Sequence, residues 1–161
     1  MNLICPQIRN SDEPFLFALY STVRAEEMTL VPWDDNQKTA FLQSQFKAQQ
    51  EYYLTSYPQG SFQLIELDGK SIGRLYLAEL DDEIRIIDLT ILPEYRGKGF
   101  GSEIISDILQ KAAKPVRIYL ESFNQSNDLF KRFGFYKVSD EGVYQLWECR
   151  EIGNKSLKAI G

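Results

Sequence analysis

The sequence predicts a mixed α/β domain, and two observations carry this prediction. Helical and strand periodicities alternate along its 161 residues in the order β-α-α-β-β-β-α-β-α-β-β. A β-branched run, a glycine-rich loop, a helical stripe and another strand also follow one another between residues 84 and 120. We expect residues 1–150 to form a single domain, because a chain of this length buries a core without disulfides or metals. Residues 151–161 are expected to form a loose C-terminal tail.

The first third of the chain predicts a short strand near residues 3–8 and then two helices. Apolar residues recur from Phe15 to Val23 with the spacing of one helical face. Asp34 and Gln37 have the spacing of a capping box, which predicts that a longer helix begins there and continues to about Tyr53.

The remaining chain alternates between strands and helices. Asp68-Gly69 separates two apolar runs, 62–67 and 71–77, and this dipeptide is typical of a tight hairpin with a type I′ turn. The other expected elements are strands at 84–91 and 116–120, helices at 102–112 and 129–133, and a final hairpin of strands at 135–138 and 143–149.

Composition excludes several functional classes. The chain contains no histidine, which excludes the catalytic triads and zinc sites that need an imidazole. Cys5 and Cys149 are too far apart in sequence to form a CxxC redox or zinc motif. We interpret both as buried thiols, with a nucleophile or a disulfide as the alternatives. We therefore expect no metal cofactor.

The charge balance bears on partners and location. Eighteen lysines and arginines against 23 aspartates and glutamates give a net charge of −5. Nonspecific binding to nucleic acid or to an anionic membrane needs a basic face, so we expect neither as a partner. The sequence shows no secretory leader and no long apolar segment, a pattern that predicts a cytoplasmic protein.

The most informative segment lies between the strand at 84–91 and the helix that follows it. It reads Arg96-Gly97-Lys98-Gly99-Phe100-Gly101-Ser102. Glycines let the backbone approach a ligand, and the helix N-terminus adds about half a positive charge, which Arg96 and Lys98 supplement. This chemistry suits a pyrophosphate, and a glycine-rich turn without a ligand is the alternative. The spacing matches neither a dinucleotide-binding GxGxxG nor a Walker A loop.

Two motifs resemble the GNAT superfamily of N-acetyltransferases. Arg96-x-x-Gly99-x-Gly101 is similar to the acetyl-CoA loop of that family, (Q or R)-x-x-G-x-(G or A). The segment from Asn124 to Phe135 resembles its later motif, Asn-x-Ala-x-x-Leu-Tyr-x-x-x-Gly-Phe. The element order is similar over residues 3–149. The resemblance implies a mostly antiparallel central sheet flanked by helices, with a splayed pair of strands at the CoA site.

The same resemblance implies where acetyl-CoA binds as the co-substrate. Its pantetheine arm is expected along Leu89, Thr90 and Ile91, whose backbone would pair with it as with an added strand. Its pyrophosphate is expected on the backbone amides from Gly97 to Ser102. The remaining positions that match cofactor contacts of the family are Asn124, Phe130 and Arg132. Lys131 is the alternative to Arg132 as a phosphate ligand. The alternative interpretation for both cations is a solvated basic face of the helix.

Without histidine, a carboxylate must take the proton of the acceptor amine, directly or through water. Glu121 is the first candidate, because it ends a strand beside the expected CoA site and resembles a glutamate that some family members use. An exposed strand-end carboxylate is the alternative reading. Asp88 is the second candidate, because a charge that interrupts an apolar strand is rarely idle. An ion pair with Arg74 or Arg85 is the alternative there.

Phe130 departs from the family pattern. Many members have a tyrosine there, whose hydroxyl is placed to protonate the departing sulfur, and phenylalanine cannot donate a proton. A thiol has a pKa near 8.5, so thiolate is a tolerable leaving group without that acid. Three tyrosines or a water molecule are left as substitutes: Tyr119, Tyr136 and Tyr144.

We therefore expect an N-acetyltransferase that moves an acetyl group from acetyl-CoA directly to an amine. The acceptor is an amine-bearing small molecule, peptide or protein, and its choice is expected to depend on residues 24–57. A non-catalytic acyl-CoA-binding module, regulatory or scaffolding, is the alternative, as is transfer of a longer acyl group. No motif sets the oligomeric state, monomer or homodimer.

Overall fold

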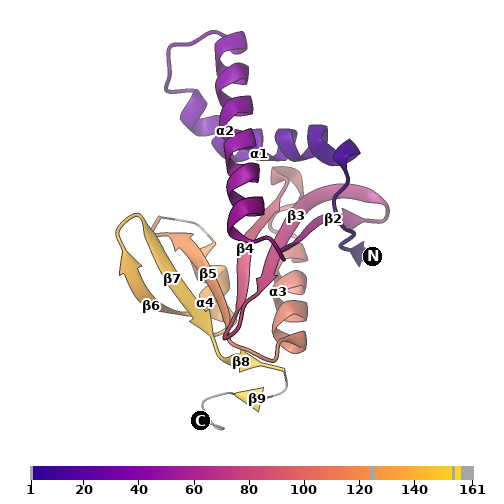
Figure 1. Ribbon diagram of the computed structural model, residues 1–161, viewed down its shortest axis with the longest axis vertical. Coiled ribbons are helices and arrows are strands. Elements are labelled where there is room, and N and C mark those ends of the chain that lie inside the picture. The colour runs from indigo at the N-terminus through magenta and orange to yellow at the C-terminus, as the bar shows by residue number, and fades with distance from the viewer. Residues whose placement is uncertain (1, 124–125, 154, 157–161) are drawn as a thin grey trace. The chain divides into compact units, whose positions relative to one another are not determined.

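Figure 1 shows the computed structural model of the chain, which describes residues 2–123, 126–153 and 155–156. The expected order of helices and strands is confirmed. The helices are α1 (Glu13–Met28), α2 (Asp35–Ser56), α3 (Phe100–Lys111) and α4 (Asn127–Arg132), with 3₁₀ turns η1 (Asn10–Asp12) and η2 (Pro93–Tyr95). The strands are β1 (Leu3–Ile4), β2 (Ser61–Leu67), β3 (Lys70–Glu79), β4 (Ile84–Ile91), β5 (Val116–Glu121), β6 (Tyr136–Glu141), β7 (Tyr144–Cys149), β8 (Glu151–Ile152) and β9 (Lys155–Ser156).

The sheet is mixed and mostly antiparallel, as the resemblance implied. Within the described residues, seven strands form one sheet in the order β1-β2-β3-β4-β5-β7-β6. The pair β4–β5 is parallel, whereas β1–β2, β5–β7 and β6–β7 are antiparallel. The parallel pair arises because β4 and β5 are joined through the helix α3, the crossover that a parallel connection requires.

The described chain divides into two compact units. Unit 1 comprises residues 1–75 and 89–95, and unit 2 comprises residues 76–88 and 96–161. In unit 1, α1 and α2 pack through aromatic side chains, since the Phe46 ring lies 5.6 Å from Phe17 and 5.5 Å from Tyr20 between centroids. The buried side chains of this core are Leu16, Tyr20, Met28, Leu42, Phe46 and Leu64.

In unit 2, α3 buries one face of the helix, and β5 buries every second side chain. Of the helical stripe expected from the sequence, Ile104, Ile105, Ile108 and Leu109 are buried, and Phe100 is buried with them. Ala112, the last expected position, follows the end of the helix and is half-buried. Along β5, Val116, Ile118 and Leu120 are buried, whereas Tyr119 and Glu121 are exposed. The alternation separates an apolar face of this strand from a polar one.

Two local predictions are confirmed by hydrogen bonds and backbone angles. The Gln37 amide donates to Asp34 Oδ1 at 2.8 Å, and the Asp34 amide donates to Gln37 Oε1 at 3.0 Å, which completes the capping box of α2. Asp68 and Gly69 have φ of 50° and 84°, the left-handed pair that a type I′ turn between β2 and β3 requires.

The expectation of a loose tail from residue 151 onward is wrong for its first residues. Ile152 is only 4% exposed, and β8 pairs with β9. The Gly153 amide donates to the Leu109 carbonyl at 2.6 Å, so it satisfies one of the carbonyls that the end of α3 leaves without an intrahelical donor. An apolar side chain and a helix end therefore hold this segment. None of the described helices is long and apolar enough to cross a bilayer.

Candidate functional site

The glycine-rich loop from Arg96 to Ser102 lies within unit 2 and leads directly into α3. Gly97 and Gly99 have φ of 73° and 90°. Residues other than glycine adopt this left-handed backbone conformation at a cost of roughly 1–2 kcal/mol. Gly99 is the N-cap of α3, and the first intrahelical bond runs from the Glu103 amide to its carbonyl at 3.0 Å. The amides of Gly101 and Ser102 precede that bond, so helix geometry gives them no intrahelical acceptor.

The loop has open space beside its glycines, which carry no side chain. A Cβ built on Gly97 or Gly99 would meet no heavy atom within 4 Å. Arg96 and Lys98 are exposed beside this space, whereas the Phe100 side chain is buried and anchors the first turn of α3. Backbone amides and a helix N-terminus therefore border open space in a loop that also carries two exposed cations, which is a suitable environment for an anion.

The end of β4 lies in unit 1, where Leu89, Thr90 and Ile91 are half-buried. The Leu92 amide, just beyond the strand, donates to the Ile72 carbonyl of β3 at 2.8 Å. The parallel register between β4 and β5 comprises Ile84↔Val116, Arg85↔Arg117 and Ile86↔Ile118. The pairs of this register therefore end before the three residues at which a pantetheine arm was expected.

The two candidate bases point to opposite faces of the sheet. Glu121 is exposed at the last position of β5 and pairs across to Tyr144 of β7. Asp88 is half-buried on β4, two residues after the buried Ile86. Because Ile86 pairs with Ile118, strand alternation places Asp88 on the apolar face of β5 and Glu121 on the other face. A single acceptor pocket on one face can therefore use only one of them.

The later motif forms the short helix α4. Phe130 is 3% exposed and its ring meets Phe135 edge-on, with centroids 5.2 Å apart. Arg132 is exposed, whereas Lys131 extends over the Trp147 ring, 5.6 Å from its centroid. Of the two cations considered for the phosphates, Lys131 is thus directed toward Trp147. Asn124, expected to contact the cofactor, lies outside the described residues.

A buried ionic network occupies the polar face of β5 and β7. Glu148 is 3% exposed and accepts hydrogen bonds from Tyr136 Oη at 2.8 Å, Arg117 Nε at 2.8 Å and Arg150 Nε at 3.0 Å. Glu83 pairs with Arg85 at 2.7 Å in the same unit. Burial alone would raise the pKa of Glu148, but the donors outweigh it and hold the pKa below its usual value.

The three tyrosines considered as proton donors have different surroundings. The hydroxyl of Tyr136 is committed to Glu148, and burial followed by this hydrogen bond raises its pKa. Burial, with the charge of Glu141, raises the pKa of Tyr119, whose ring lies 5.0 Å from the guanidinium carbon of Arg85. Tyr144 is 50% exposed beside Glu121. Tyr119 and Tyr144 thus share the face of Glu121 near the end of β5.

Sequence reasoning missed Gly73 of β3. The backbone of Gly73 lies so close to the backbone of Thr90 and Ile91 that a Cβ at position 73 would collide with it. A glycine inside a strand pattern often marks such a close backbone approach, so this signal was present in the sequence. Gly73 belongs to the same unit as the end of β4, and it fixes how closely β3 can approach that end.

Comparison with known proteins decides the family. A model described as the acetyltransferase (GNAT) family matches residues 19–135, which include the loop, both candidate bases and α4. The chain belongs to the GNAT acetyltransferase family. The match runs through both compact units of this GNAT protein. No individually curated protein matches the chain.

Solved structures show the same fold. The PaiA N-acetyltransferase of Thermoplasma acidophilum, solved with coenzyme A, is 15% identical with a TM-score of 0.66, over 92% of this chain and 99% of its own. An acetyltransferase of Thermus thermophilus is 16% identical with a TM-score of 0.65, over 92% and 96%. Naa50 of Arabidopsis thaliana, in complex with the bisubstrate analogue CoA-Ac-MVNAL, is 16% identical with a TM-score of 0.56, over 92% and 97%.

Proposed function

We propose that this GNAT protein transfers an acetyl group from acetyl-CoA directly to an amine, with a carboxylate as the general base. The observation that carries the proposal is the loop at the start of α3. Its left-handed glycines leave open space beside amides that have no intrahelical acceptor. This is the donor set that a pyrophosphate requires, so the residues present fit CoA.

Each part of the cofactor has residues suited to hold it. The amides from Gly97 to Ser102 bind the pyrophosphate, and the exposed Arg96, Lys98 and Arg132 neutralise its charge. Backbone groups of Leu89 to Ile91 bind the amides of the pantetheine arm. Phe130 and Asn124 complete the expected contacts. When bound, acetyl-CoA supplies the activated acetyl group as a thioester.

Glu121 is the proposed base. Its carboxylate is exposed at the end of β5, where an incoming amine can reach it, and Tyr119 and Tyr144 share its face. A carboxylate on this face accepts the proton that the amine loses when it attacks an acyl carbon. Asp88 is the second candidate, half-buried on the apolar face. Because Glu121 and Asp88 lie on opposite faces of the sheet, the acceptor amine would approach one face if Glu121 is the base and the other face if Asp88 is the base.

Position 130 offers no proton donor for the departing thiolate. Phe130 contributes an apolar wall, and a proton for the leaving sulfur comes from Tyr119, Tyr144 or water. Tyr144 is 50% exposed, and Tyr119, with Arg85 over its ring, is 41% exposed, so both tyrosines are open to solvent. The acceptor amine belongs to a small molecule, a peptide or a protein, and residues 24–57 select it.

A second candidate function is binding of acyl-CoA without turnover, in a regulatory or scaffolding role. The absence of a hydroxyl at Phe130, a position that the family often fills with tyrosine, favours it. Both functions predict CoA binding by the loop, but only the first predicts release of free thiol.

The deciding experiment measures free thiol released from acetyl-CoA over a panel of polyamines, amino sugars, lysine peptides and peptides with free N-termini. We expect release to depend on one class of amine and to be abolished without it. Tight CoA binding with no release for any acceptor would favour the binding module instead.

A further inference from the structure

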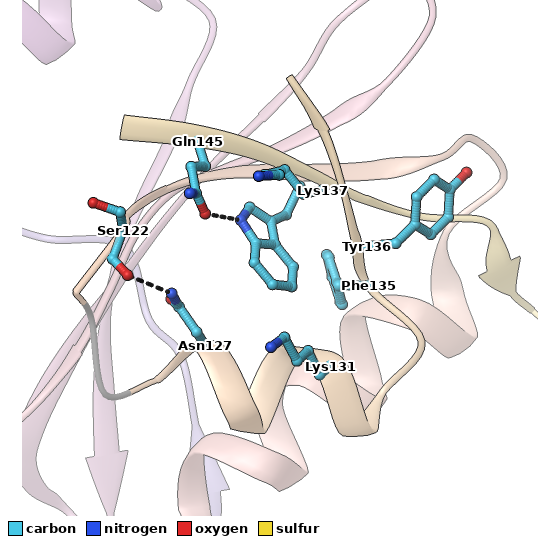
Figure 2. Close-up of a pocket in the computed structure, with 8 residues that line it drawn as sticks. Ser122, Asn127, Lys131, Phe135, Tyr136, Lys137 and Gln145 are labelled. Carbon is cyan, nitrogen blue, oxygen red and sulfur yellow. Dashed lines mark hydrogen bonds between the residues drawn. The ribbon is translucent and has the colours of Figure 1, made fainter. Parts of the chain in front are cut away.

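Side chains of α4 and of the β6–β7 hairpin line a pocket away from the glycine-rich loop. The structure has an open pocket of about 490 Å³ there, within the roughly 300–1,000 Å³ common for small-molecule sites. Figure 2 shows Asn127 and Lys131 on α4, Lys137 and Gln145 on the two strands, and the hydrogen bond from Asn127 to Ser122. Phe135 and Trp147, which are 3% and 5% exposed, form its aromatic floor.

The charged side chains among the described residues that line this pocket are lysines. Lys131 and Lys137 line it, and none of its described lining residues is a carboxylate, although acidic residues outnumber basic ones in the chain. Lys137 lies 3.3 Å from Asp140, but both side chains are about half exposed, so this pair is worth little. Lys131 rests over the Trp147 ring. The described lining residues therefore carry two positive charges, one of which is paired with Asp140.

The aromatic surface is held in place. Lys137 and Trp147 are cross-strand partners of β6 and β7, which sets the ammonium of one strand beside the indole of the other. The Trp147 indole N–H donates to Gln145 Oε1 at 3.1 Å, as the dashed line in Figure 2 marks, so its ring orientation is fixed. Trp147 is 5% exposed and Lys131 rests over its ring, so a flat ring in the pocket would lie against the two lysines and not on the indole face, which suits a ring that carries an anionic group.

One buried polar atom also lacks a partner here. The amide nitrogen of Asn127 donates to the Glu121 and Ser122 carbonyls at 3.4 Å, both long contacts. Its Oδ1 is buried and accepts no hydrogen bond from any described residue. A buried acceptor without a donor costs roughly 1–3 kcal/mol, which a ligand with a donor group could offset after a small side-chain rotation.

Of the cofactor contacts expected on α4, Phe130 and Arg132 do not line the pocket, whereas Lys131, the alternative phosphate ligand, does. Asn127 and Lys131 are four residues apart and lie on one stripe of the helix, whereas Arg132 is turned about 100° from Lys131. No residue from Arg96 to Ser102 lines the pocket, and neither does Arg132.

We propose that this pocket binds a planar anion, an aromatic or heteroaromatic ring that carries a carboxylate or a phosphate, at a site independent of CoA. The test uses two charged rings, benzoate and AMP, which distinguish a carboxylate from a nucleotide source. Benzyl alcohol supplies a ring without charge, and acetate supplies charge without a ring. Trp33 and Trp147 are the two tryptophans, so a Trp33→Phe variant reports binding through Trp147 fluorescence.

We expect saturable binding of benzoate or AMP with a Kd below about 1 mM, and at least tenfold weaker binding of benzyl alcohol and acetate. Lys137→Met should weaken the preferred probe tenfold or more and leave CoA affinity unchanged. Lys111→Met, an exposed lysine on α3, is the charge-matched control and should change neither. Arg132→Met should weaken CoA but not the probe. Binding of neither charged ring, equal binding of acetate, or displacement of the probe by saturating CoA would each overturn the proposal.

Discussion

The carbonyl oxygen of Thr90 lies 2.3 Å from the position that a Cβ on Gly73 would occupy, and the Cα of Ile91 lies 3.1 Å from it. Both obstacles are backbone atoms, so neither can rotate away as a side chain would. Gly73 therefore sets the distance between β3 and the end of β4, where the amides of the pantetheine arm are proposed to bind.

Gly73→Ala should push this end of β4 out of place. We expect a loss of about 1–3 kcal/mol in the free energy of unfolding, in the range of overpacked cores, and at least a tenfold loss of CoA affinity. Ser71→Ala is the control, because it lies on the same strand and already carries a Cβ. Chemical denaturation and calorimetry measure the two effects. A wild-type free energy of unfolding and a wild-type CoA affinity in Gly73→Ala would show that the backbone at Thr90 moves aside freely.

The loop prediction uses two glycines with the same backbone angle. Gly99 and Gly142 both have φ of 90°, and a Cβ on either meets nothing within 4 Å. Alanine at either position should therefore cost similar stability, roughly 1–2 kcal/mol. Only Gly99→Ala places a methyl group where the pyrophosphate is proposed to approach, so it should weaken CoA tenfold or more in calorimetry. Equal CoA affinity in the two variants would contradict the proposed role of the loop.

Local signals made most of the fold predictable. The capping box of Asp34 and Gln37 and the turn at Asp68-Gly69 depend on neighbours within three residues, so the sequence alone identifies them. The loop before α3 was recognisable for the same reason. Contacts between distant segments were not predictable. Ile152 was assigned to a tail because its burial depends on residues far away in sequence.

The candidate site also combines features that local motifs identify with contacts between distant segments that they do not. The network around Glu148 includes residues 83, 117 and 136, which come close to it only through the pairing of β4, β5, β6 and β7. Glu121 and Asp88 were both identified from sequence as candidate bases. Their opposite orientations follow from the register Ile86↔Ile118, which no local motif specifies. Strand pairing therefore supplied what the motifs could not.

Glu121→Gln tests the proposed base. The substitution keeps the shape of the side chain and removes its basicity, so turnover should fall about 100-fold or more while CoA affinity stays constant. Glu79→Gln is the matched control, since Glu79 is also an exposed glutamate at the last position of a strand. Thiol release is measured with one accepted amine. Full turnover in Glu121→Gln, together with a loss in Asp88→Asn, would transfer the role to Asp88.

Glu148 should make stability depend on pH in the acid range. Its folded pKa lies below the unfolded value of 4.5, so its stabilising contribution is present above that value and is lost as the pH falls through the folded pKa. Glu148→Gln should be less stable than the wild type at neutral pH, by on the order of 1–3 kcal/mol. The difference should shrink below about pH 4.5 in denaturation curves. Glu103→Gln, on the exposed side of α3, should show no such narrowing. A constant difference at all pH values would exclude this role.

Phe130→Tyr tests whether the site operates without the hydroxyl that the family often supplies. Phe130 and Phe135 are each 3% exposed and pack edge-on, so a hydroxyl added to either ring carries a similar packing cost. If thiolate leaves unprotonated in the native enzyme, Phe130→Tyr should raise turnover, most clearly at low pH, where protonation of the leaving group helps most. Phe135→Tyr is the matched control and should not raise it. The measurement is thiol release against pH for all three proteins with one accepted amine. Unchanged or reduced turnover in Phe130→Tyr, with CoA affinity intact, would show that Tyr119, Tyr144 or water already serves as the donor.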